Sequence, residues 1–225
     1  MGPALLTNWI TDVRKPNATK PLVVEIGPGT FKGTLFCQGV SNVSVKGSGP
    51  ENTILETIQG NNCYRLNVQD LTVSNSFIGI YWTNAGTSFW TNVHVRDGLY
   101  AWSEVCPQYT ERAIHYWFNS RLHSTAKTYL ASCSENWLFS SEIVASGPGL
   151  AGSLKPLLAY RYSTAPSTLV PEIHVYGSVV RTIAAPGVSY NAPKANSNEG
   201  DGLLAAFAGA NAKNPYTRHR NRYNR

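Results

Sequence analysis

The chain has 225 residues, which suits one large domain or two small ones and is enough to bury a core without disulfides or metal ions. Only 14% of the residues are charged and 11% are aromatic, and Gly, Asn, Ser and Thr are frequent, which excludes a coiled coil, a helical bundle and a charged disordered chain. The net charge is +6, but five basic residues and no acidic residue lie in 213–225. The body is therefore nearly neutral, and we expect no nucleic-acid partner for it.

Residues 1–14 predict an N-terminal cap. Residues 4–14 have the pattern of a short amphipathic helix, which would cover the open end of a stack of strands. The first residues lack the basic start and long apolar stretch of a signal peptide, so the protein is expected to be either cytoplasmic or secreted with a signal peptide that precedes this sequence. No segment approaches the roughly 20 apolar residues that span a bilayer, and we expect no membrane association.

Short strand-like segments bounded by Gly, Asn, Ser, Asp or Pro follow from residue 22. Three of them, 42–45, 70–73 and 92–95, share the pattern Asn/Asp-apolar-polar-Val and recur after 28 and 22 residues. A repeat of this length without helical periodicity predicts an all-β solenoid, a right-handed single-stranded parallel β-helix over residues 15–190. A β-sandwich is the alternative, because it also joins many short strands by turns. Asparagines suited to the turns of such coils are Asn62, Asn67, Asn75, Asn84, Asn92, Asn119 and Asn136.

The last part of the chain is expected to depart from this repeat. Residues 191–212 predict a loop followed by a last coil or short cap, which includes the apolar segment 203–208. The basic tail, 213–225, is interpreted either as a disordered end or as the frameshifted end of a longer repeat protein, since one out-of-frame reading of its codons resembles the strand–turn–strand segment 172–183. An uncovered last coil would favour self-association through the open end of the β-helix.

Three segments near the N-terminus resemble the first coils of pectinesterase-like β-helix proteins: VEIGPGTFK (24–32), VSNVSVKGSGPENTIL (40–55) and VQDLTVSN (68–75). The resemblance covers about residues 22–76 and implies a parallel β-helix, a polysaccharide partner and an extracellular or periplasmic location. The family's catalytic motifs QAVAL, QDTL, DFIFG and LGRPW are absent, as are the signatures of polygalacturonases and pectate lyases. We therefore expect a secreted, polysaccharide-associated protein that is non-catalytic or divergent. The alternatives are a carbohydrate esterase or lyase acting on uronic-acid polymers and a structural or assembly protein.

Chemistry on a sugar acid requires groups of different pKa that lie close together, often with a cation for the carboxylate. Two residues apart on one strand, His94 and Arg96 share a face, and that face is solvent-exposed if Val93 and Val95 point into the core. The Asp-Gly pair 97–98 is also an ordinary turn, and we interpret both acids of the cluster as turn or surface groups. A second group (Glu111, Arg112, His115, Arg121 and His123) is dispersed and predicts solvated surface. The candidate catalytic residues are His94, Arg96, Asp97 and Glu104.

Aromatic residues are concentrated between 81 and 118. Adjacent aromatic pairs at 81–82, 89–90 and 116–117 require one ring outside and one inside, because neighbours on a strand point to opposite faces. Exposed rings can stack on sugar rings or form a protein–protein patch, whereas buried rings fill the core. The candidate ligand-binding residues are Trp82, Trp90, Tyr100 and Trp102.

The four cysteines are spaced so that pairs can stack on neighbouring coils. Cys37 and Cys63 are 26 residues apart, and Cys106 and Cys133 are 27 apart, about one coil in each case. Two disulfides and buried free thiols are both consistent with this spacing. No Cys-x-x-Cys motif and no nucleotide or haem motif occurs, so we expect no metal and no cofactor.

Overall fold

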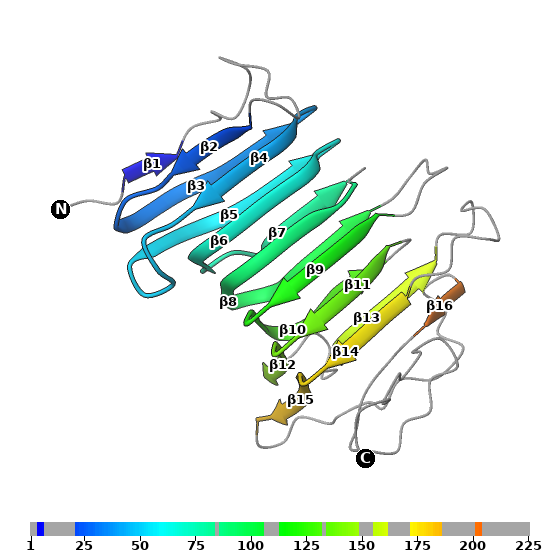
Figure 1. The fold of residues 1–225 in the computed structure, drawn as a ribbon. Helices are drawn as coiled ribbons and strands as arrows, with labels where there is room; N and C mark the ends of the chain where they lie inside the picture. Colours follow the sequence, from blue (N-terminus) through cyan, green and yellow to red (C-terminus); the bar gives the residue numbers. More distant parts are fainter. Residues whose placement is uncertain are drawn as a thin grey trace.

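The computed structural model describes residues 4–6, 21–83, 86–105, 113–131, 134–148, 155–161, 172–185 and 201–203. Every regular element in these residues is a β-strand, and Figure 1 shows the strands stacked from the N-terminal to the C-terminal end of the molecule. The strands are β1 (Ala4–Leu6), β2 (Leu22–Glu25), β3 (Gly29–Gln38), β4 (Ser41–Lys46), β5 (Thr53–Asn61), β6 (Tyr64–Ser74), β7 (Ile78–Thr83), β8 (Ser88–Val105), β9 (Ile114–Phe118), β10 (Arg121–Ala131), β11 (Glu135–Phe139), β12 (Glu142–Gly147), β13 (Lys155–Arg161), β14 (Glu172–Tyr176), β15 (Val179–Ala184) and β16 (Asp201–Leu203).

The chain winds in successive coils, and each coil adds strands to three faces. The first face contains β2, β4, the starts of β6 and β8, β9, β11 and β14. The second face contains the starts of β3 and β5, the end of β6, the middle of β8, the start of β10, β12 and β15. The third contains the ends of β3 and β5, β7, the ends of β8 and β10, and β13. All these pairs are parallel, whereas a β-sandwich is antiparallel, so the prediction of an all-β parallel β-helix is confirmed.

A column of left-handed residues forms the corner between the first and second faces. Asp70, Asn92, Asn119, Ser140 and Gly177 have φ of 58°, 53°, 47°, 47° and 55°. Asn and Asp tolerate this conformation better than other side-chain-bearing residues, because their short polar groups form local hydrogen bonds. The amide of Asn92 donates to the carboxylate of Asp70 on the preceding coil at 2.8 Å. Of the asparagines predicted for turns, Asn92 and Asn119 lie at this corner, whereas Asn67 and Asn136 lie within the strands β6 and β11 and that part of the prediction is wrong.

Serines next to the corner tie each coil to the one before it. The backbone N–H of Val93 donates to Ser120 Oγ at 3.2 Å, and the N–H of Ser120 donates to Ser141 Oγ at 3.1 Å. The N–H of Ser141 in turn donates to Ser178 Oγ at 2.9 Å. Because buried backbone donors require partners, these hydroxyls stabilise a corner whose N–H groups point away from the strand ladders.

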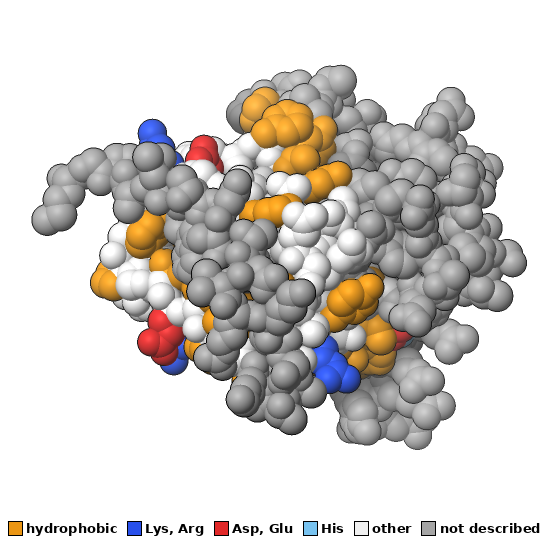
Figure 2. Space-filling view, turned by 90° about the horizontal axis from the view of Figure 1, so that it is seen from above, with side chains coloured by type: hydrophobic (Ala, Val, Ile, Leu, Met, Phe, Trp, Pro, Cys, Tyr) orange, Lys and Arg blue, Asp and Glu red, His pale blue; other side chains and the backbone are white. Residues whose placement is uncertain are grey.

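Four tryptophans fill the centre of the core, and we call Trp82, Trp90, Trp102 and Trp117 the tryptophan cluster. Trp90 stacks on Trp117 of the next coil, with ring centroids 5.2 Å apart and planes 15° apart. Trp82 lies opposite Gly60, where an added Cβ would come within 2.3 Å of the indole ring. The glycine therefore makes room for the widest side chain of the core. Among the described residues visible in Figure 2, hydrophobic side chains lie among polar ones and a few charged side chains.

The predicted helical cap is wrong where the structure tests it. Ala4–Leu6 is the strand β1, which pairs in parallel with residues 31–33 of β3. A strand satisfies the backbone groups along the open edge of the first coil, which a helix would leave without partners. Within the predicted loop 191–212, Asp201–Leu203 forms β16, antiparallel to β13. The basic tail, 213–225, lies outside the described residues.

Cys37 and Cys63 are buried free thiols, so the disulfide interpretation is wrong for this pair. The Cys63 thiol donates to the backbone carbonyl of Cys37 at 2.8 Å, which gives it a partner inside the core. A hydrogen bond with the Cys63 side chain, and then burial, raise the pKa of the Cys37 thiol. Cys106 and Cys133 lie outside the described residues.

We expect Cys37 to resist alkylation in the folded protein, because the reactive species is the exposed thiolate. A chain with Cys106→Ser and Cys133→Ser isolates the buried pair. Treatment with iodoacetamide at neutral pH should leave both remaining thiols unmodified in buffer and modify both in concentrated urea, as read by intact mass. Rapid modification of Cys37 in buffer would contradict its burial.

Candidate functional site

The tryptophans predicted to bind a ligand lie in the core. Trp82, Trp90 and Trp102 have no exposed surface, so their rings are not available to a sugar, and this prediction is corrected. Each adjacent aromatic pair does place one ring outside, as expected, but the indole is the inner partner. Tyr100 is partly buried and packs edge-on against the exposed Phe77, with ring centroids 5.3 Å apart.

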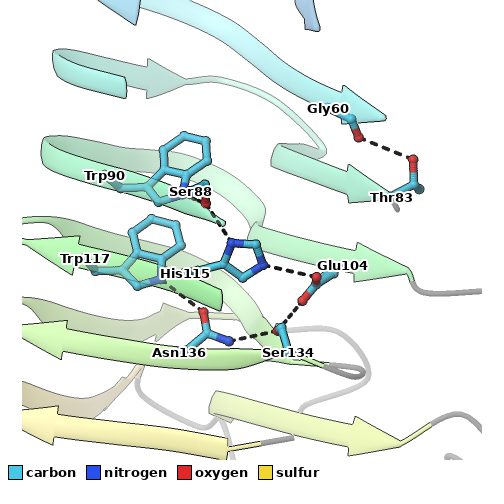
Figure 3. Close-up of polar contacts among 9 residues, drawn as sticks. All are labelled: Gly60, Thr83, Ser88, Trp90, Glu104, His115, Trp117, Ser134 and Asn136. Carbon is cyan, nitrogen blue, oxygen red and sulfur yellow. Dashed lines mark hydrogen bonds and ion pairs between the residues drawn. The ribbon is translucent and has the colours of Figure 1, made fainter. Parts of the chain in front are cut away.

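Glu104 and His115, which were expected at the surface, are fully buried next to the tryptophan cluster (Figure 3). His115 Nε2 lies 3.1 Å from Glu104 Oε1, and His115 Nδ1 lies 2.7 Å from Ser88 Oγ. Ser134 Oγ donates to Glu104 Oε2 at 2.5 Å and accepts from the Asn136 amide at 3.0 Å. We call these five residues the buried polar network, and it joins three successive coils.

This network contains a serine, a histidine and a carboxylate in series, which are the groups of a hydrolytic triad. Ser88 Oγ also accepts the indole N–H of Trp90 at 2.7 Å, and Asn136 accepts that of Trp117 at 3.1 Å. The hydroxyl is therefore engaged on both sides, and no member of the network reaches solvent. The chain of bonds assigns an Nε2–H tautomer to His115, with Ser88 donating to Nδ1. We interpret the network as structural, since no substrate can approach the serine.

The second face brings together most of the other predicted site residues. Val93 and Val95 point into the core and His94 and Arg96 point outward, as expected. Asp97 accepts a hydrogen bond from Ser74 Oγ at 3.0 Å and lies 3.7 Å from Arg96 Nε.

Arg121 and His123, predicted to be dispersed, lie on the neighbouring strand of this face, with Arg121 in register with His94. Burial lowers the pKa of His94, and the Arg121 and Arg96 charges lower it further, while Glu51 acts in the opposite direction. Burial and the Arg121 charge likewise lower the pKa of His123. Both imidazoles are therefore biased towards the neutral form.

A groove of about 400 Å³ lies on the first face. Its lining combines amides and hydroxyls, one exposed arginine and two phenyl rings. No carboxylate of the described residues pairs with the Arg65 guanidinium. The lining residues are Pro21, Asn42, Ser44, Arg65, Asn67, Phe89, Thr91 and Phe118.

Outward-pointing aromatic rings continue from the groove along the later coils of the first face. The rings of Phe89 and Tyr116 are 5.1 Å apart with planes at 9°, and the same values hold for Phe118 and Phe139. Phe139 in turn stacks on Tyr176 of the next coil, again with ring centroids 5.1 Å apart and planes at 9°. We call this set the aromatic ladder: Phe89, Tyr116, Phe118, Trp137, Phe139 and Tyr176.

The stacking decides which surfaces of these rings can meet a ligand. Parallel rings only 5.1 Å apart must overlap face to face, because rings lying side by side in one plane would collide at that distance. Rings inside the ladder therefore cover each other's faces, and only their edges are exposed to solvent. Phe89 and Phe118 begin the two columns, and their neighbours on the preceding coil are Asn67 and Thr91. Their free faces border the groove.

Sequence reasoning missed the ladder, although the sequence carries its signal. The segments YWFNS (116–120), WLFSS (137–141) and HVYGS (174–178) repeat one pattern, with outward rings two apart, then the left-handed corner and its serine. Residues two apart on a strand share a face, so this repeat predicts a ring column.

Among the described residues, no group of three or more His, Cys, Asp or Glu side chains is arranged to hold a metal ion. The same part of the chain contains no helix long and apolar enough to cross a membrane.

Two solved structures share this fold. A pectin methylesterase variant in complex with a hexasaccharide superimposes with a TM-score of 0.53 and 15% identity, over 80% of this chain and 63% of that chain. Pectin methylesterase PemA from Erwinia chrysanthemi superimposes with a TM-score of 0.52 and 12% identity, over 80% of this chain and 62% of that chain. The chain thus spans less than two thirds of either protein. No protein-family model and no curated protein matches it by sequence. The likeness confirms that the chain has a pectinesterase-like parallel β-helix fold.

Proposed function

We propose that this protein binds an acidic polysaccharide in the groove of the first face without cleaving it. The observation that carries the proposal is the composition of the groove. It joins the free faces of two aromatic rings to a guanidinium and several amide and hydroxyl groups.

Each kind of group matches one part of a uronic-acid residue. The face of Phe89 offers a platform for the C–H face of a pyranose ring. The guanidinium of Arg65 suits a carboxylate, which it can bind through two parallel N–H donors. The side chains of Asn42, Ser44 and Asn67 supply donors and acceptors for ring hydroxyls.

The same lining argues against chemistry in the groove. Among the described residues, the lining includes no carboxylate, histidine or cysteine, so these residues offer neither a general acid nor a general base. Bound sugars would therefore stay intact. An extracellular or periplasmic location is part of the same proposal, since the protein would meet the proposed ligand there.

Calorimetric titration with oligogalacturonate tests this proposal. Phe89→Ala and Arg65→Gln should each weaken binding about tenfold, since interface anchors are typically worth 1–2 kcal/mol or more. Phe77→Ala is the matched control, because Phe77 is a 67% exposed ring that does not line the groove. Arg65→Gln should have little effect on the fully methyl-esterified oligosaccharide, which lacks the carboxylate. Unchanged affinity in Phe89→Ala would overturn the proposal.

An esterase or lyase acting on uronic-acid polymers is the second candidate, favoured by the grouping of His94, Arg96 and Asp97 on the second face. The purified chain is assayed for methanol release from esterified pectin and for unsaturated products from polygalacturonate. We expect neither. Activity that Asp97→Asn abolishes would replace the binding proposal with the enzymatic one.

A further inference from the structure

The second face carries an arrangement of arginines that the proposed groove does not use. Arg121 on β10 and Arg181 on β15 flank Glu142 on β12, the strand between them. Arg121 Nε lies 2.9 Å from Glu142 Oε2, and Arg181 Nη2 lies 2.5 Å from Glu142 Oε1. One carboxylate thus holds two guanidinium groups from different coils. We infer that Arg121 and Arg181 form a binding site for an oxyanion, a sulfate or phosphate group or a carboxylate.

The donors of the two arginines remain largely available. A guanidinium has five N–H donors, so one carboxylate with two oxygens cannot engage all the donors of both arginines. The arginine side chains are 47% and 48% exposed, whereas that of Glu142 is 27% exposed. The guanidinium groups therefore stand further into solvent than the carboxylate that orients them. An anion arriving from solvent meets N–H donors whose orientation is already fixed, which reduces the entropy lost on binding.

The charges around this site favour an anion. Two guanidinium groups face one carboxylate, and the nearest other pair, Arg96 with Asp97, is balanced. His123 lies beside them and contacts Ser146 Oγ. Burial lowers the pKa of His123, and the Arg121 and Arg181 charges contribute, against opposite contributions from Asp97 and Glu142. The set of Arg121, Glu142 and Arg181 carries one net positive charge, which a bound oxyanion would neutralise.

The floor beneath the arginines is apolar. Val144 is in register with His123 on one side and Arg181 on the other, and it is fully buried. The strand between the two arginines therefore carries a side chain closed to solvent beside its carboxylate, and the ion pairs lie at the edge of this apolar position.

A purely structural role for the three residues is the competing explanation, since half-exposed ion pairs also connect strands. The two explanations differ in what they predict for added anions. A structural ion-pair network is weakened by any salt through screening and has no saturable affinity. An oxyanion site saturates and prefers sulfate to chloride.

Calorimetric titration of the full chain with sodium sulfate, at ionic strength held constant with sodium chloride, tests the site. We expect saturable binding that Arg121→Gln and Arg181→Gln each weaken about tenfold, the effect of losing one charge-assisted hydrogen bond. Arg181→Lys should also weaken binding, because a lysine keeps the charge but not the fork of donors. Lys46→Gln removes an exposed cation on the first face that does not line the groove, so it is the matched control and should bind sulfate like the unmodified chain. Thermal midpoints of all variants verify that they fold.

The source of the oxyanion is distinguished in the Arg65→Gln variant, in which ligand binding in the groove of the first face is weakened. If oligogalacturonate competes with sulfate there, the site takes a group carried by a glycan. If only inorganic sulfate or phosphate competes, the site takes the free ion. The inference is overturned if sulfate shows no saturable binding, or if both arginine-to-glutamine variants bind it as the unmodified chain does.

Discussion

Replacing Trp90 by alanine is expected to lower the free energy of unfolding by about 3–5 kcal/mol, the usual cost of removing a large aromatic side chain from a packed core. The indole is fully buried, stacks on Trp117, and meets Trp82 and Trp102 edge to face at 5.5 and 5.4 Å. Its removal would leave a cavity lined by three rigid rings, which cannot collapse into the space. Urea unfolding followed by far-ultraviolet circular dichroism measures the loss.

Phe89→Ala is the matched control, because Phe89 precedes Trp90 on the same strand but points outward and is 38% exposed. It should lose only the contribution of one stacked pair, about 0.5–1.5 kcal/mol. The variant Trp90→Phe keeps an aromatic ring, and its loss in free energy of unfolding should lie between the losses of the two alanine variants. Equal losses in Phe89→Ala and Trp90→Ala would contradict the assignment of inner and outer rings.

His115→Ala is expected to cost about 2–5 kcal/mol, because two buried hydrogen bonds are lost and removing one partner of a buried hydrogen bond costs about 1–3 kcal/mol, more when the remaining group is charged. The carboxylate of Glu104 would lose its contact at 3.1 Å, and Ser88 Oγ would lose its contact at 2.7 Å. The penalty arises mainly from a buried carboxylate and a buried hydroxyl that each lose one of their hydrogen bonds, rather than from lost packing. Thermal unfolding monitored at several pH values measures it.

His94→Ala provides the comparison, since His94 lies on the outer surface of the second face, where substitutions usually stay within about 0.5 kcal/mol. His115→Gln retains a polar side chain and should recover part of the loss. A destabilisation of His115→Ala no larger than that of His94→Ala would show that the buried polar network does not hold the three coils together.

The buried polar network and two rings of the tryptophan cluster meet on the first face. Three successive strands there, the start of β8, β9 and β11, each point two residues inward, a polar one and then a large apolar one: Ser88 with Trp90, His115 with Trp117, and Asn136 with Leu138. The polar members lie in one column and the apolar members in the next. His115 and Ser134 both bond to Glu104 of the third face, so the buried carboxylate is tolerated beside indole rings.

The sequence by itself determined the strands and their alternation. Val43, Val45, Val93 and Val95 point inward as their spacing predicted, because side chains on a strand alternate between two faces. The corner residues could also be predicted from the sequence, since Asn92 and Asn119 belong to the residue types that tolerate a left-handed backbone. Parallel coils followed from the repeat and from the resemblance to pectinesterase-like proteins. These features depend on local chemistry, which one segment carries alone.

Only the tertiary structure decided which side chains meet. Positions aligned on the first face, from Trp90 through Trp117 and Leu138 to Val175, are 27, 21 and 37 residues apart. Because the connecting segments vary in length, spacing along the chain does not reveal which residues stack in one column. Glu104 was therefore predicted at the surface although it is buried beside His115, and Arg121 was predicted to be dispersed although one carboxylate contacts both Arg121 and Arg181. The register between coils, which is set by packing around the indoles, decides these contacts.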